Sequence, residues 1–236
     1  MLSVCYMWRQ TALEYLWREL LLLVDEENGK AYNCRPEWVE LYWQLHVSEN
    51  LVRELSVSVQ RESIFSGVGH ELLSEYMGST TILPHVRKLR ILISDEVGQS
   101  GFATGNAITN ALQFADLLKL MTPAVSSVEV KFDEGLWSLG KDDERVLGVF
   151  LKSIYGKATY AMLDAKETGL RHLSTVELIP QLTTLTLFYV STIDVHISLV
   201  HKCAKTLLSL DIALCGAKEL LYDVNGNGVI YSNMQY

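Results

Sequence analysis

One short pattern of apolar positions returns along this chain of 236 residues. An apolar residue is followed, after two other residues, by three apolar residues that alternate with single intervening ones. Such alternation is typical of a short strand with one buried face. Five segments carry the whole pattern and predict strands: Val52-Leu55-Val57-Val59, Val86-Leu89-Ile91-Ile93, Val125-Val128-Val130-Phe132, Leu182-Leu185-Leu187-Tyr189 and Leu207-Leu210-Ile212-Leu214. Weaker copies are Ala158-Ala161-Leu163 and Leu173-Val176-Leu178.

Segments with helical spacing lie between these predicted strands. They are Val68 to Met77, Ile108 to Met121, Glu144 to Tyr155 and Ile193 to Ala204. Asn106 predicts an N-cap for the second helix, and Asp142 and Asp143 do the same for the third. Gly156 predicts where the third helix ends.

Units of one strand and one helix cannot bury their apolar faces alone, so their repetition predicts a stacked α/β solenoid with parallel strands. The copies start at residues 52, 86, 125, 158, 182 and 207. The last two spacings lie in the range of about 20–29 residues of leucine-rich repeats, and we interpret the longer ones as repeats with enlarged loops. The asparagine or cysteine position of the standard repeat is not evident, which predicts an irregular solenoid. A doubly wound α/β sheet is the alternative, because it has the same order of elements.

Residues 3–20, SVCYMWRQTALEYLWREL, carry a different motif. It resembles the second half of an F-box, the helical module that docks onto a Skp-type adaptor in cullin-based ubiquitin ligases. The resemblance implies a helix with a Val-Cys-x-x-Trp-Arg motif, then a Leu-Trp turn whose indole packs a small helical core. It also implies an adaptor-binding remnant made of Val4, Cys5, Trp8, Arg9, Leu16 and Trp17.

The motif departs from the family at two points. Tyr6 and Met7 stand where family members carry a basic or polar pair, and the half that contains Leu-Pro would precede Met1. The alternative is an amphipathic helix whose Trp8 and Trp17 simply fill a core. Farther along, Arg35 to Leu45 predicts a joint helix with Pro36 in its first turn.

The arrangement as a whole resembles fungal F-box proteins with leucine-rich-repeat-like C-terminal regions, most clearly from Asn50 to Ile93. We therefore predict a helical F-box-like remnant and joint helix over residues 1–48. A leucine-rich-repeat-like α/β domain, incomplete at its C-terminus, follows over residues 49–236.

This resemblance implies a non-enzymatic protein-interaction module. We expect a substrate receptor of a cullin-based ubiquitin ligase or a truncated relative, located in the cytoplasm or nucleus. Its expected partners are a Skp-type adaptor and a protein substrate. Two alternatives stay open: a doubly wound α/β enzyme and a non-functional fragment.

Charge and composition exclude several other classes. The net charge is −8, and no cluster of lysine and arginine is present, so a nucleic-acid-binding role is not expected. The apolar run from Leu20 to Val24 is far shorter than the ~20 residues of a membrane helix. Four cysteines lie far apart without a Cys-x-x-Cys pair, which favours a reducing compartment.

We predict no catalytic, cofactor-binding or metal-binding residues. Asp223 to Ile230 matches part of a calcium-binding loop, but Met234 stands where a bidentate glutamate is required. His196 and His201 are five residues apart, which spoils the geometry of a metal pair on a helix. The glycines between Gly98 and Gly105 match neither a phosphate-binding loop nor a dinucleotide fingerprint.

Overall fold

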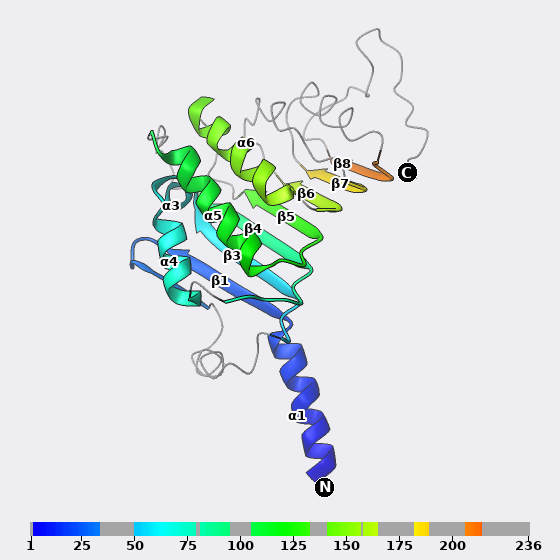
Figure 1. Cartoon of the computed structure of the whole chain (residues 1–236). Helices are drawn as coiled ribbons and strands as arrows, with labels where there is room; N and C mark the ends of the chain where they lie inside the picture. The colour runs from blue at the N-terminus through cyan, green and yellow to red at the C-terminus, as the bar shows by residue number, and fades with distance from the viewer. Residues whose placement is uncertain are drawn as a thin grey trace.

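The computed structural model describes residues 2–33, 50–78, 81–94, 105–132, 141–156, 158–164, 182–188 and 206–213. One sheet of eight strands, in the order β2-β1-β3-β4-β5-β6-β7-β8, forms its centre (Figure 1). The seven strands from β1 through β3 to β8 pair in parallel, and β2 pairs antiparallel with β1 at one edge. The parallel strands therefore lie in the sheet in the order in which they occur in the chain.

The elements have the following bounds. The strands are β1 Glu19–Asp25, β2 Lys30–Asn33, β3 Glu54–Gln60, β4 Lys88–Ser94, β5 Ser127–Phe132, β6 Tyr160–Asp164, β7 Thr184–Phe188 and β8 Ser209–Ala213. The helices are α1 Leu2–Trp17, α3 Arg61–Ser66, α4 Val68–Met77, α5 Ala107–Met121 and α6 Lys141–Tyr155.

The helices α3, α4, α5 and α6 form a layer on one face of the sheet (Figure 1). Alternate residues of each strand point to this face, and the strand register aligns them in continuous apolar rows. One row is Leu20, Leu55, Leu89, Val128, Ala161 and Leu185, and the next begins with Leu22, Val57, Ile91 and Val130. Phe114 of α5 and Phe150 of α6 stack above the rows with ring centroids 6.1 Å apart. These rows and the helix layer together make up the core.

A backbone contact repeats at the start of the parallel strands. The carbonyl oxygen of Arg18, just before β1, accepts hydrogen bonds from the N–H groups of Arg53 and Glu54, at 2.8 and 2.9 Å. The same double contact joins each later strand to the one before it. The carbonyl groups that accept it are those of Arg53, Arg87, Ser126, Thr159 and Thr183. All seven strands consequently start at one level.

The predicted strands and helices match the described elements closely. Six copies of the apolar pattern, starting at residues 52, 86, 125, 158, 182 and 207, fall on β3 to β8. The helix predicted over Val68 to Met77 is α4, and α5 and α6 each begin slightly earlier than predicted. The prediction of an α/β protein with parallel strands is confirmed.

Helix ends are less well predicted than helix bodies. Asn106 holds the N-cap position of α5, but its side chain makes no capping hydrogen bond. Asp142 and Asp143 lie inside the first turn of α6 instead of before it. Gly156 directly follows the last residue of α6, as predicted. Four predicted features lie outside the described residues: the joint helix from Arg35, the copy at 173–178, the helix at 193–204 and the turn at 223–230.

The sheet begins earlier than predicted. Trp17-Leu20-Leu22-Val24 is a further copy of the apolar pattern, and it forms β1 beside β3. The prediction of a helical segment over residues 1–48 did not include β1 or β2. The turn between them is closed by Asp25, whose carboxylate accepts hydrogen bonds from the backbone and side chain of Asn28. These hydrogen bonds lower the pKa of Asp25.

A buried ion pair joins two helices of the layer, α3 and α6, that are separated by α5. Arg61 is the first residue of α3 and Asp143 lies in the first turn of α6, and α5 lies between these helices. Arg61 Nη1 donates to Asp143 Oδ2 at 3.1 Å, and both side chains are almost fully buried. An ion removed from water in this way depends strongly on its counter-ion.

We expect Asp143→Asn to lower the free energy of unfolding by about 3–5 kcal/mol, because it removes the negative charge that is paired with the buried Arg61 guanidinium. Denaturant unfolding measures the change. Asp142→Asn is the matched control, since the neighbouring Asp142 side chain is exposed and should change stability by no more than about 0.5 kcal/mol. Equal effects of the two variants would contradict the assigned role of the pair.

Candidate functional site

The face of the sheet opposite the helix layer is a candidate functional surface. No described helix covers it (Figure 1), and we call it the open face. Strand register places its side chains in rows, like those of the core. The first row is Glu19, Glu54, Lys88, Ser127, Tyr160, Thr184 and Ser209; the second is Leu21, Ser56, Arg90, Glu129, Met162, Thr186 and Asp211; the third begins with Leu23, Ser58, Leu92, Lys131 and Asp164.

Arg90 lies at the centre of an ion cluster on this face. Its guanidinium contacts Glu129 Oε2 at 3.0 Å, Glu19 Oε1 at 3.1 Å and Glu54 Oε2 at 3.5 Å. The hydroxyl of Ser56 donates to Glu19 Oε1 at 2.9 Å. One arginine thus joins carboxylates of β1, β3 and β5 across four adjacent strands.

The charges in this cluster satisfy one another. Burial by itself lowers the pKa of Arg90, but the hydrogen bond and charge of Glu129 and the charges of Glu54 and Glu19 outweigh it and raise the pKa. Lys88 forms an ion pair with the second oxygen of Glu129. The cluster is therefore a polar clamp across the open face, and its two cations are already occupied.

Apolar side chains adjoin the clamp. Leu21 of β1 and Leu92 of β4 are 38% and 40% exposed, although they lie on strands of a well-buried sheet. Leu21 and Leu92 lie two strands apart and in different rows. The open face therefore combines charged positions with separate apolar ones.

The predicted adaptor-binding residues all lie on α1, which extends away from the sheet (Figure 1). Trp8 is 73% exposed, Cys5 is exposed, and Trp17 is only 2% exposed. The two tryptophans are nine positions apart, which puts them on opposite sides of the helix and about 13 Å apart along its axis. The structure therefore does not bring Trp8 and Trp17 together. The side chains of Val4, Arg9 and Leu16 lie outside the described part of the structure.

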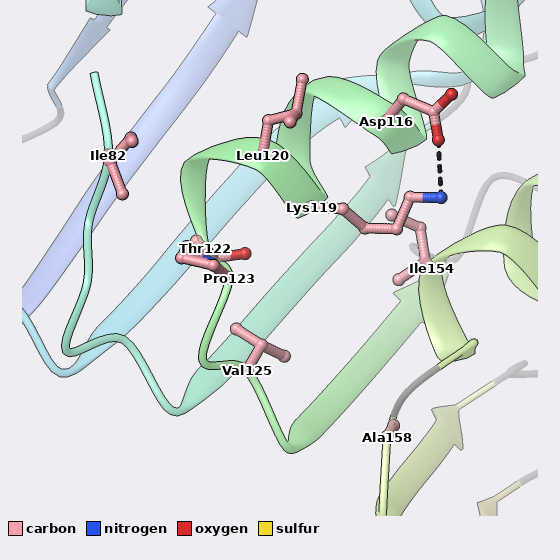
Figure 2. Close-up of a pocket in the computed structure, with 9 residues that line it drawn as sticks. All are labelled: Ile82, Asp116, Lys119, Leu120, Thr122, Pro123, Val125, Ile154 and Ala158. Carbon is pink, nitrogen blue, oxygen red and sulfur yellow. Dashed lines mark ion pairs between the residues drawn. The ribbon is translucent and has the colours of Figure 1, made fainter. Parts of the chain in front are cut away.

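A cavity of about 640 Å³ opens on the helix side, where α5 and α6 end and the turns into β4, β5 and β6 begin (Figure 2). Asp116 and Lys119 form an ion pair of 2.6 Å at its wall, and Lys119 also donates to Ser153 Oγ. The Thr122 hydroxyl donates to the Leu118 carbonyl oxygen at the end of α5. The lining is Ile82, Asp116, Lys119, Leu120, Thr122, Pro123, Val125, Ile154 and Ala158. Its polar groups are engaged with one another, and the cavity offers mainly apolar surface.

Within the described residues, no three His, Cys, Asp or Glu side chains converge in a group that could hold a metal ion. None of the described helices is long and apolar enough to cross a membrane.

Comparisons of the chain with protein-family models, with curated proteins and with solved structures gave no significant match.

The residues of the open-face clamp were not predicted from the sequence, although the sequence contains a signal for them. When the copies of the apolar pattern are aligned on their first residue, Glu19, Glu54 and Lys88 occupy the same position, two residues later. Arg90 and Glu129 also share a position, four residues after the first residue of their copies. Alignment of the copies thus predicts neighbours on the open face, but not which of the charges pair.

We expect Arg90→Gln to destabilise the protein by about 1 kcal/mol, because three carboxylates lose their shared cation in a partly exposed cluster. The loss should shrink as salt is added, since salt screens the remaining repulsion. Thermal unfolding at low and high ionic strength measures both effects. Lys131→Gln on the same face is the control, because Lys131 is exposed and the described structure records no ion pair for it; a loss equal to that of Arg90→Gln would contradict the clamp.

The two tryptophans should differ in their effect on stability. Trp17→Ala removes a buried indole and is expected to cost about 3–5 kcal/mol in the free energy of unfolding. Trp8→Ala should leave that energy within about 0.5 kcal/mol of the wild-type value, since its side chain is largely exposed. Denaturant unfolding compares the two. A large loss from Trp8→Ala would show that Trp8 belongs to a core.

Proposed function

We propose that this chain is a protein-interaction module of the F-box and leucine-rich-repeat type, acting as a substrate receptor of a cullin-based ubiquitin ligase or as a truncated relative of one. The observation that carries the proposal is the recurrence of one contact at every parallel strand, together with a sheet face that no described helix covers. A protein with this design offers a surface instead of a catalytic crevice.

The order of the strands supports a solenoid-like interpretation. In a doubly wound sheet the strand order reverses, helices cover both faces, and ligands bind at the point of reversal. The described parallel strands follow chain order without a reversal, and the four helices of the layer lie on one face. Stacked repeats produce this arrangement, because each unit contacts mainly its neighbours.

The exposure of α1 supports a partner at the N-terminal helix. Tyr6, Met7, Trp8 and Tyr15 are between 66% and 81% exposed. α1 has 16 residues, little more than the about 12–15 residues below which an isolated helix is marginal, and most of the stability of a helix in a protein comes from tertiary packing. A second protein that covers these side chains would stabilise α1. The resemblance of residues 3–20 to an F-box indicates that this protein is a Skp-type adaptor.

A capture experiment with a purified Skp-type adaptor tests this role. We expect the immobilised adaptor to retain the wild-type chain, and Trp8→Ala to reduce the retained amount at least tenfold. The reason is that buried tryptophans at interfaces commonly contribute 2 kcal/mol or more.

Leu120→Ala provides the control, since Leu120 of α5 is 71% exposed and lies outside the motif. This variant should be retained like the wild type, and the melting temperatures of both variants should match that of the wild type. If the adaptor does not retain the wild-type chain, or retains Trp8→Ala equally well, the ligase role is rejected.

A further inference from the structure

We propose that the open face binds an extended segment of a partner protein with a basic residue seated on Asp164 and apolar residues over Leu92 and Leu23. This inference rests on the proposed function, because it names the kind of partner that the interaction surface takes.

Asp164 is the feature that directs the proposal. It is the last residue of β6 and faces the open side, as the alternation from Ala161 and Leu163 on the core side requires. The residue is only 8% exposed, and its Oδ1 atom has no hydrogen-bond partner in the described structure. A carboxylate that is largely removed from water without a counter-ion is costly. A cation from a bound partner would offset that cost.

The surroundings of Asp164 favour a donor from outside the chain. Its register neighbour on β5 is Lys131, an exposed residue, and the described structure records no ion pair between them. Lys88 and Arg90 are occupied by the glutamates of the clamp. Among the described residues, the basic side chains of this face are thus either engaged or turned to solvent, and none of them neutralises Asp164.

Charge favours a basic segment over an acidic one. The open-face positions of the seven parallel strands carry six carboxylates, on Glu19, Asp25, Glu54, Glu129, Asp164 and Asp211, against three cations, on Lys88, Arg90 and Lys131. The whole chain is also acidic, with a net charge of −8. Complementary charge of this kind guides a basic partner to the surface and disfavours an acidic one.

The spacing of the face sets the spacing of the ligand. Leu92 lies in the same row as Asp164 but two strands away, and Leu23 lies two strands beyond Leu92. Two strand spacings amount to about 10 Å. A partner segment in the polyproline II conformation covers about 9 Å in each turn of three residues, and every third side chain then points to the same side. The segment that fits therefore has apolar residues and a basic residue at every third position, in the form Leu-x-x-Leu-x-x-Arg. The aliphatic stem of the arginine would lie along Met162, the buried neighbour of Asp164 on this face.

Fluorescence anisotropy with synthetic peptides tests the inference. The probe is a fluorescein-labelled peptide Leu-x-x-Leu-x-x-Arg with serine or threonine at each x, and its control carries glutamate in place of arginine. We expect saturable binding of the arginine peptide and at least about tenfold weaker binding of the glutamate peptide, as for the loss of a charge-assisted hydrogen bond.

Two variants assign the binding to Asp164. Asp164→Asn keeps the shape of the side chain but removes its charge. It should weaken binding of the arginine peptide at least about tenfold without lowering the melting temperature of the protein. Lys131→Ala removes a like charge beside the bound arginine and should tighten binding at least about twofold. Asp211→Asn is the control, since Asp211 is exposed on β8 and away from the row of Asp164.

The inference is overturned if the wild type does not bind the arginine peptide, if Asp164→Asn binds it equally well, or if Lys131→Ala weakens binding. A result of this kind is separable from failure of the ligase role, because adaptor capture depends on Trp8 of α1 and not on the open face. Peptide binding without adaptor capture would reject the ligase role alone. Adaptor capture without peptide binding would reject only the proposal that the open face binds a basic segment.

Discussion

One carbonyl oxygen before each parallel strand holds two N–H groups of the next strand, and this contact sets the level at which the sheet is built. Because the strands start together, the apolar residues that follow at fixed distances fall into rows, and the rows are what the helix layer covers. The same constraint places the intervening residues in rows on the open face. Glu19, Glu54 and Arg90 can meet there only because their strands are in register. Core and surface are therefore two products of one backbone arrangement.

The parts of the fold that depend on local pattern could be predicted from the sequence, and those that depend on distant pairing could not. Each strand from β3 to β8 shows its alternation within a few residues, so periodicity located it. Arg61 and Asp143 are 82 residues apart, and Arg90 is 71 residues from Glu19. Nothing in either local sequence indicates such a partner. Asp164 was missed for a related reason, since an unsatisfied carboxylate is defined by what surrounds it in space.

The strand β1 was missed because its pattern is obscured. Leu21 and Leu23 face the open side, while Leu20 and Leu22 face the core. With leucine on both faces, the strand reads as a continuous apolar run and shows no alternation. Trp17, the first residue of this copy of the pattern, was interpreted as part of the F-box-like motif. In the structure it occupies the position that Val52 and Val86 occupy in the next two copies. Trp8 has no such second role, and the adaptor hypothesis therefore depends on it more than on Trp17.

The strand β2 has a consequence for how the sheet meets its surroundings. An unpaired strand edge is a template on which other chains can polymerise, and proteins protect such edges with short strands and charged residues. β2 is four residues long and begins with Lys30, whose ammonium lies 5.6 Å from the centre of the Tyr32 ring. It also runs against the direction of all seven parallel strands, so the parallel series of the described sheet stops at β1. The hairpin of β1 and β2 thus gives this side of the described sheet a short antiparallel strand that carries a lysine, which is a poor template for the addition of another chain.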